Sequence, residues 1–288
     1  MNPKYPIYII SKGRWESRYT VKALDKMKTP FRVVVEPKEY ENYNSVINSN
    51  KILKLPSNFS ELGKGSIPVR NWVWEHSIKE GYKKHWILDD NLQDFYRLNK
   101  NKRLHVASGT IFKCAEDFVD RYKNVSMAGL NYMTFAIPRK NLAPFYLNTR
   151  VYSCILLSNN LKHRWRGKYN EDTDLSLRVL KDGDCTILFN AFTCDKVATM
   201  RMTGGNTDEL YIQNKFQDGR KKMAESLVKQ HPDCVRMAWK WDRWTHFVDY
   251  KKFKVNNKLI KKDGLNIRKG INNYGMKLIQ LNKPLNNS

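Results

Sequence analysis

Short apolar runs alternate with segments of helical periodicity from the start of the chain. Residues 5–10 (YPIYII) form an apolar run, residues 19–27 carry apolar side chains at helical spacing, and residues 31–35 (FRVVV) are apolar again. A strand, a helix and a strand within about forty residues are typical of a βαβ unit with parallel strands. We therefore expect an α/β fold that begins close to the N-terminus.

The same alternation continues through much of the chain. Further strands are predicted at residues 52–55, 86–88, 126–136, 152–157 and 186–189, and helices from residue 68 and over residues 172–180. This order predicts a mixed, mostly parallel sheet flanked by helices, in one domain over residues 1–250. Residues 251–288 are basic and rich in Asn, and we expect a mostly extended, partly docked basic arm there.

Composition narrows the class of protein. The 288 residues include 52 Lys and Arg against 28 Asp and Glu, a net charge of +24, which favours a polyanionic partner. Hydrophobic residues make up 41%, enough for a folded core. The 5 cysteines form no CxxC pair, and no apolar window approaches about eighteen residues. We expect a cytoplasmic protein without disulfides or membrane contact.

Two adjacent acids follow a strand in the stretch HWILDDN. Asp89, Asp90 and Asn91 stand at the carboxyl end of this strand, where ligands bind in open α/β sheets. Oxygen ligands of this kind suit Mg²⁺ or Mn²⁺, and two adjacent carboxylates repel each other unless a cation or a proton intervenes. The alternative is an Asx turn or a helix cap, which residues of this type also form.

A second acidic group, NEDTD, opens the predicted helix near residue 172. Glu171 and Asp172 there are candidates for a general base that takes a proton from an acceptor hydroxyl, with Asp172 as the first choice. Acids in a first helical turn also stabilise the helix through its dipole, which remains the alternative.

Phosphate oxygens require cationic or backbone N–H donors, and two segments supply candidates. Arg70 stands near a predicted helix N-terminus, with Lys64 in the glycine-containing loop before it. Arg201 precedes the pair Gly204 and Gly205, whose backbone can approach a diphosphate closely. Each is also compatible with an ordinary surface charge or turn.

Three other features leave alternatives open. His246 is a candidate metal or diphosphate ligand, although a lone His in an aromatic stretch is more often structural. Basic and aromatic residues alternate at residues 162–166 (KHRWR) and 239–244 (WKWDRW). Such mixtures suit phosphate neutralisation and base stacking, but the tryptophans could equally belong to the core.

The sequence resembles the TET-associated glycosyltransferases of bacteriophages, which have the GT-A fold. The resemblance rests on the stretches IYIISKGRW, VRNWVWEHS leading into HWILDDN, NEDTDLSLRVLKDG and RWTHFVDYKKF, and spans residues 7–253. It implies a Rossmann-like GT-A sheet and the transfer of a sugar from a UDP-sugar to a hydroxymethylated base, such as 5-hydroxymethylcytosine, in phage DNA.

The resemblance also implies roles for particular residues. Asp89, Asp90 and Asn91 match the motif that binds Mn²⁺ or Mg²⁺ and the sugar nucleotide, with Asp90 slightly favoured as the metal ligand. Residues 11–14, with Ser11, Lys12 and Arg14, match the region that holds the nucleotide base and ribose. Glu171 and Asp172 match the acceptor-side acidic pair. Asn91 departs from many GT-A motifs, which carry a carboxylate at that position.

Three other classes of function account for part of these features. A metal-dependent nuclease would use Asp89, Asp90 and Glu171 on DNA. A non-catalytic DNA-binding protein would use the acids only as caps and turns. A transferase with a non-DNA acceptor would share the donor half of the site.

Overall fold

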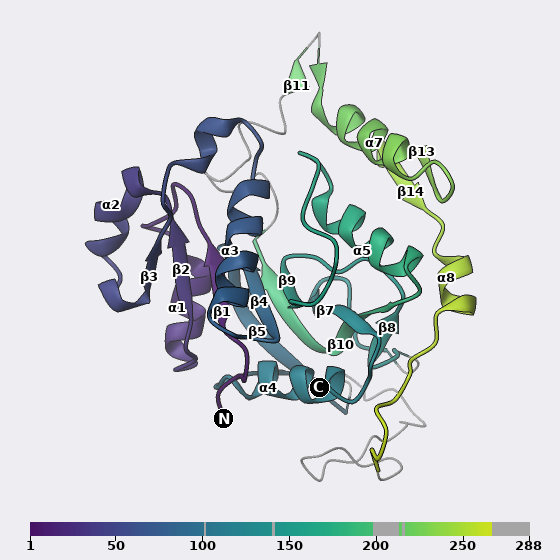
Figure 1. The fold of residues 1–288 in the computed structure, drawn as a ribbon, viewed down its shortest axis with the longest axis horizontal. Coiled ribbons are helices and arrows are strands. Elements are labelled where there is room, and N and C mark those ends of the chain that lie inside the picture. The colour runs from purple at the N-terminus through teal and green to yellow at the C-terminus, as the bar shows by residue number, and fades with distance from the viewer. Residues whose placement is uncertain (101, 140–141, 198–212, 215–216, 267–288) are drawn as a thin grey trace.

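The computed structural model describes residues 1–100, 102–139, 142–197, 213–214 and 217–266, and its centre is a 10-stranded sheet (Figure 1). Its strands are β1 (Ile7–Ile10), β2 (Arg32–Val35), β3 (Ile52–Lys54), β4 (Lys84–Asp89), β5 (Leu92–Asn99), β6 (Lys102–His105), β7 (Val125–Tyr132), β8 (Phe145–Leu147), β9 (Cys154–Ser158) and β10 (Cys185–Lys196). The strand order is β3-β2-β1-β4-β9-β7-β10-β5-β6, with β8 paired to β10.

Helices and two small hairpins complete the described structure. The helices are α1 (Tyr19–Lys26), α2 (Tyr40–Asn44), α3 (Ile67–Lys79), α4 (Thr110–Val119), α5 (Glu171–Lys181), α7 (Gly219–Gln230) and α8 (Lys251–Asn256). Short 3-10 helices occupy Pro37–Glu39, Ser49–Lys51 and Phe59–Leu62. The hairpins are β11 (Gln213–Asn214) with β12 (Gln217–Asp218), and β13 (Val235–Lys240) with β14 (Arg243–Val248).

The strand directions confirm the expected mixed, mostly parallel sheet. β1 pairs in parallel with both β2 and β4, and β7 pairs in parallel with β10. Only β9, β5 and β8 run against the other strands of this sheet. The arrangement is Rossmann-like, so the carboxyl ends of β1, β4 and β10 meet at one edge, where β9 begins.

Two apolar layers cover the two faces of the sheet. One layer joins the sheet to α1, α2 and α4 and contains Leu24, Trp86 and Phe112. The opposite layer joins it to α3 and α5 through Val73 and Leu175, and these two helices lie toward the viewer in Figure 1. Strands that alternate Ile, Val and Leu between both faces are therefore buried on both sides, as central parallel strands require.

A third apolar cluster attaches the C-terminal elements to α5. Leu177 and Leu180 on the outer side of α5 pack with Leu227, Val235 and Phe253 of α7, β13 and α8. The arm expected from residue 251 is thus partly docked, but its first residues form α8 rather than extended chain, because Phe253 is buried in this cluster. Within the described residues, no helix is long and apolar enough to cross a membrane.

Gly129 in β7 marks the closest approach of two backbones in the sheet centre. A methyl group on Gly129 would clash with the Cys154 carbonyl oxygen and would lie 2.5 Å from Val151 Cγ1. Both neighbours are buried, and the Cys154 carbonyl belongs to the backbone of the paired strand β9, so it cannot move away cheaply.

We expect Gly129→Ala to lower the free energy of unfolding by about 1–3 kcal/mol, the usual cost of overpacking a core. Urea unfolding followed by circular dichroism measures it. Gly81→Asn is the matched control, because a Cβ at Gly81 meets nothing and Asn tolerates its positive φ of 79°. Equal unfolding midpoints for the Gly129→Ala protein and the wild type would contradict this account.

Candidate active site

The edge at which β1, β4 and β10 end and β9 begins gathers charged side chains from distant parts of the sequence. Ser11 follows β1, Asp89 ends β4, Lys196 ends β10, and Ser153 immediately precedes β9. Because sheet pairing holds these four positions side by side, residues separated by up to 107 positions meet at hydrogen-bonding distance. This edge of the sheet forms the candidate site.

Asp89 is held as a carboxylate by two cations and a hydroxyl. Its Oδ2 accepts from Lys196 Nζ at 3.0 Å and Ser153 Oγ at 2.7 Å, and its Oδ1 lies 3.3 Å from Arg70 Nη2. Burial alone would raise the pKa of Asp89, but Lys196 and Arg70 outweigh it and lower the pKa to about 2. The side chain still exposes 27% of its surface, so Asp89 presents a permanent negative charge to a ligand.

Asp90 faces inward and fixes the loop after β1. Its Oδ2 accepts from Ser11 Oγ at 2.8 Å and its Oδ1 forms an ion pair of 2.5 Å with Arg14 Nη1. Only 5% of Asp90 is exposed, and burial raises its pKa despite the Arg14 charge. Ser11 and Arg14 therefore lie against the acidic motif, and both oxygens of Asp90 are engaged by them.

Asn91 and Lys12 complete the predicted donor-side set. Asn91 is buried, and its Oδ1 has no hydrogen-bond partner among the residues that the structure describes. A buried amide oxygen of this kind usually has a partner, so its orphaned state is compatible with a ligand. Lys12 is half-buried near Glu39, whose pKa is raised by burial. Arg201, Gly204 and Gly205 lie outside the described residues.

Arg70 connects the two acidic groups of the site. From the first turn of α3 its Nη2 reaches Asp89, and its Nε lies 3.5 Å from Glu171 Oε1 at the start of α5. The guanidinium also stacks over the ring of Trp165 at 4.8 Å, which fixes its plane. The predicted donor-side and acceptor-side acids therefore belong to one site, joined by a single buried cation.

The N-terminal ends of two helices also meet here. Ser66, the residue before α3, donates to Glu171 Oε1 at 3.1 Å, and Glu171 is the first residue of α5. Burial raises the pKa of Glu171, Arg70 opposes this, and Asp172 adds to it. Helix N-termini carry partial positive charge, so this corner favours an anion such as a diphosphate.

Asp172 points to a separate group of side chains. Its Oδ1 accepts from the backbone N–H of Thr173 at 2.7 Å. Burial would lower the pKa of Arg150, but the nearby Asp172 charge raises it. Burial and Arg150 lower the pKa of His246, and Asp172 counteracts them. The charge of Asp172 therefore acts on His246. No cluster of three or more potential metal-binding side chains occurs among the described residues.

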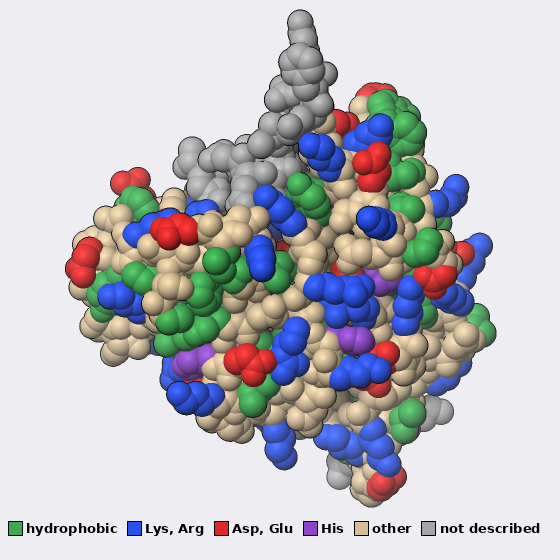
Figure 2. All heavy atoms as spheres, turned by 45° about the horizontal axis from the view of Figure 1, so that its top comes forward, with side chains coloured by type: hydrophobic (Ala, Val, Ile, Leu, Met, Phe, Trp, Pro, Cys, Tyr) green, Lys and Arg blue, Asp and Glu red, His purple; other side chains and the backbone are tan. Residues whose placement is uncertain are grey.

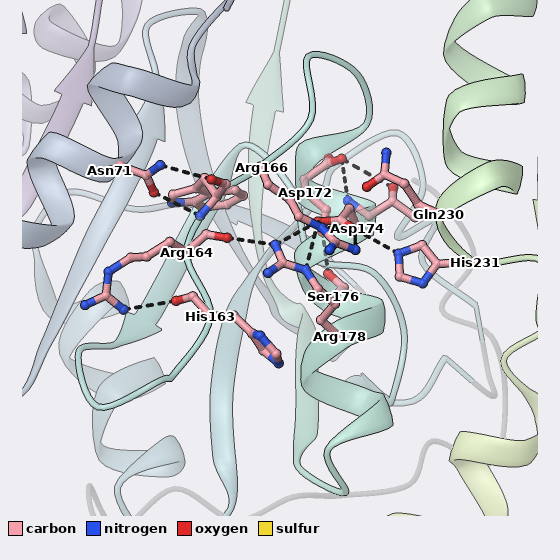
Figure 3. A network of polar contacts seen from close by, with 12 residues as sticks. Asn71, His163, Arg164, Arg166, Asp172, Asp174, Ser176, Arg178, Gln230 and His231 are labelled. Carbon is pink, nitrogen blue, oxygen red and sulfur yellow. Dashed lines mark hydrogen bonds and ion pairs between the residues drawn. The ribbon is translucent and has the colours of Figure 1, made fainter.

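Asp174, two residues further along α5, has a structural role that the sequence did not reveal. It is fully buried and accepts from Arg166 Nη2 at 3.0 Å, Arg178 Nε at 2.9 Å and His231 Nε2 at 2.9 Å. Figure 3 shows these three side chains converging on Asp174, while Asp172 lies in the same first turn of α5. The network ties the start of α5 to the end of α7.

The two basic and aromatic stretches differ in how deeply their tryptophans are buried. Trp165 of the first stretch is buried at 2% exposure, and Arg164 and Arg166 pair with Glu75 and Asp174. The tryptophans of the second stretch remain exposed on the β13–β14 hairpin. The first stretch is therefore structural.

Sequence reasoning missed Lys196, Ser153 and Arg150. Lys196 donates to Asp89, to Ser153 Oγ at 2.9 Å and to Tyr132 OH at 3.2 Å, and although burial opposes it, the Asp89 charge raises the pKa of Lys196. The strand predicted there ended at residue 189, seven residues before Lys196, so no signal set this side chain apart from the other basic residues, 52 in all.

The fold and the site define a Rossmann-like α/β protein whose crevice at the strand ends combines carboxylates with cations. The family model of the TET-Associated Glycosyltransferases matches residues 5–205. The chain belongs to this family and is a glycosyltransferase, and a family of this kind uses a nucleotide-sugar donor.

Other comparisons add little. Among curated proteins, none matches the chain. Of 17 matching chains of solved structure, one is mannose-6-phosphate isomerase from Helicobacter pylori, with 10% identity over 90% of this chain and 94% of that chain. Its TM-score of 0.29 supports no conclusion on fold or activity.

We expect Asp174→Asn to destabilise the protein by about 3–5 kcal/mol, because it leaves the largely buried Arg178 without its counter-ion. Burial would raise the pKa of Asp174, but His231, Arg166 and Arg178 lower it. A carboxylate whose pKa is lower in the folded protein than in the unfolded chain stabilises the fold at pH values above the unfolded pKa. This stabilisation is lost as the pH falls through the folded-state pKa. The unfolding free energy of the variant should accordingly fall less on acidification than that of the wild type. Equal stability of variant and wild type at pH 7 would refute the structural role.

Proposed function

We propose that the protein transfers a sugar from a UDP-sugar to the hydroxymethyl group of a modified DNA base, such as 5-hydroxymethylcytosine. The observation that carries the proposal is the bridge from Asp89 through Arg70 to Glu171. It links Asp89, the proposed donor-side carboxylate, to Glu171, the neighbour of the proposed base Asp172. A sugar transfer needs its two substrates to be bound side by side in this way.

On the donor side, Asp89 and Asn91 fit a hard divalent cation. Asp89 offers a partly exposed carboxylate and Asn91 an orphaned amide oxygen. A site with few protein ligands is usual for Mg²⁺, which takes its remaining ligands from phosphate and water. Bound Mn²⁺ or Mg²⁺ would offset charge on the diphosphate. Asp90, already held by Ser11 and Arg14, would orient the loop that contacts the nucleotide.

The cations of the crevice would stabilise the departing diphosphate. Arg70 and Lys196 flank Asp89, so a diphosphate bound beside Asp89 would meet both. Such groups are fixed before the reaction by Trp165 and Ser153, and preorganised charges of this kind lower the barrier without reorganising during it. The converging N-termini of α3 and α5 act in the same direction.

On the acceptor side, Asp172 is the proposed general base. The acceptor oxygen forms a bond to the anomeric carbon of the sugar as the bond to the diphosphate oxygen breaks, and the hydroxyl proton passes to the Asp172 carboxylate. Glu171 is engaged by Arg70 and Ser66, so its proposed role is to position the Arg70 guanidinium. The neutral alcohol requires such a base because it is a weak nucleophile near neutral pH.

A DNA acceptor is supported by the charge of the chain. The net charge is +24, and Figure 2 shows Lys and Arg side chains spread across the face that it presents. Counterion release from DNA phosphates would supply affinity for such a surface. A small sugar acceptor would gain nothing from so broad a distribution of charge.

We expect the protein, with Mn²⁺ and the appropriate UDP-sugar, to add one sugar per modified base, detected by mass spectrometry of nucleosides after incubation with 5-hydroxymethylcytosine DNA. Asp172→Asn should lower kcat about 10²- to 10⁴-fold, the usual effect of losing a general base. Asp182→Asn is the matched control, because Asp182 follows the same helix at its other end and pairs with His163.

The same preparation distinguishes the rival functions. Nicking of plasmid DNA with Mn²⁺ and no donor would indicate a nuclease instead. A melting temperature unchanged by UDP-sugar and Mn²⁺ would indicate a non-catalytic protein, because a bound donor stabilises the fold. Transfer to other acceptors combined with weak DNA binding at low salt would indicate a non-DNA acceptor.

We expect Lys196→Met to raise the KM for the UDP-sugar by roughly 10- to 100-fold, since hydrogen bonds to charged groups contribute about 1.5–3 kcal/mol. Loss of the Lys196 charge should also raise the pKa of Asp89 from about 2, which moves the acid limb of kcat/KM to higher pH. Lys181→Met removes a surface ion pair with Asp233 and should leave the donor KM unchanged. An unaltered donor KM in Lys196→Met would show that Lys196 does not serve the donor site.

A further inference from the structure

The β13–β14 hairpin presents large aromatic side chains to solvent. Trp239 is 59% exposed, Trp241 76% and Trp244 37%, although tryptophan is usually well buried. The hairpin begins at residue 235, beyond residues 5–205 that the family model matches. The family assignment therefore gives these side chains no role.

The strand register sorts the hairpin into two faces. Trp239 pairs with Trp244, and Met237 pairs with His246 two positions closer to the body, so all four side chains lie on one face. The rings of Trp239 and Trp244 meet edge to face, with centroids 5.3 Å apart. The other face carries the pair Lys240 and Arg243.

The hairpin joins the body of the protein against α5, the helix that begins with Glu171 and Asp172. Val235 and Val248, at the base of the hairpin, pack with Leu177 and Leu180 of α5. The charges of Asp172 and Arg150 act on the pKa of His246, which is two residues from Trp244 on the same face, a separation of about 7 Å along a strand. The tryptophan pair therefore extends from the helix that carries the proposed general base.

The turn of the hairpin holds Trp241 at a conformational cost. Trp241 and Asp242 have φ values of 53° and 52°, the left-handed region in which Asn and Gly are favoured at two-residue turns. Trp241 exposes 76% of its surface, so burial offsets little of this strain. A strained and exposed aromatic residue is better explained by a ligand than by stability of the fold.

We propose that Trp239, Trp241 and Trp244 stack on unpaired bases of the acceptor DNA strand, while Lys240 and Arg243, on the other face beside the turn, hold its phosphates where the strand passes around the turn. This inference deepens the proposed function and depends on it for the identity of the strand as acceptor. Charge complementarity selects the ligand: Lys240 and Arg243 flank the turn, and the Arg243 guanidinium lies 5.7 Å from the centre of the Trp241 ring. Cations interleaved with aromatic rings suit a chain of alternating phosphates and bases.

The test measures binding of a labelled, unmodified single-stranded DNA of about 12 nucleotides by fluorescence anisotropy, without any sugar donor. Trp239→Ala and Trp244→Ala should each raise Kd roughly 5- to 150-fold, the range for loss of one stacked base. Tyr82→Ala is the matched control, because Tyr82 is an exposed aromatic residue in the turn before β4, at the amino end of that strand, and should leave Kd unchanged.

Trp241→Asn separates function from fold. Asn suits the left-handed turn better than Trp, so the melting temperature should hold or rise while DNA affinity falls. Trp239→Phe and Trp244→Phe are the controls for a weakened hairpin. They preserve an aromatic face and should retain most of the DNA affinity. A strand with the same sugar-phosphate backbone but without bases should bind wild type and alanine variants equally.

Two results would overturn the proposal: wild-type DNA affinity in the alanine variants, or an equal loss of affinity on the strand without bases. Normal strand binding without sugar transfer would sink the proposed function and leave the hairpin proposal standing. Sugar transfer to modified DNA with an unchanged KM for DNA in the alanine variants would support the proposed function and overturn the hairpin proposal.

Discussion

The constraint on which the site depends is the repulsion among carboxylates crowded at one sheet edge. Three carboxylates and three cations alternate there: Asp89, Asp90 and Glu171 with Arg14, Arg70 and Lys196. Without the cations, burial would protonate the acids or push them apart. Arg70 is central because it pairs with an acid of each group, so the spacing between the donor side and the acceptor side follows from one guanidinium fixed on Trp165.

A second constraint makes the acceptor side rigid. α5 is buried both against the sheet, through Leu175, and against the C-terminal elements, through Leu177. Asp174 anchors its first turn to the end of α7 through His231. Asp172 therefore stands at the start of a helix that can neither slide nor fray easily. A general base needs this fixity, because small displacements from the reacting atoms reduce the rate strongly.

Features that depend on local periodicity were predicted from the sequence. Features that depend on packing between distant residues were not. The strand before Asp89 and the helix after Asn170 were evident, because periodicity is local. Lys196 was not, since only the pairing of β10 into the sheet brings it to Asp89. Asp172 and Asp174 stand about 200° apart around the helix, but the sequence does not say which side faces the core.

The burial of individual tryptophans also could not be predicted from the local sequence. Trp165 lies between Arg164 and Arg166, and Trp239 lies beside Lys240, yet Trp165 is 2% exposed and Trp239 59%. Trp165 is covered because α3 places Arg70 and Trp74 against it. Trp239 extends past the end of the cluster that Val235 joins and meets Trp244 edge to face, so most of its surface stays exposed. A similar local composition thus gives a buried side chain that packs on Arg70 in one case and an exposed aromatic surface on the hairpin in the other.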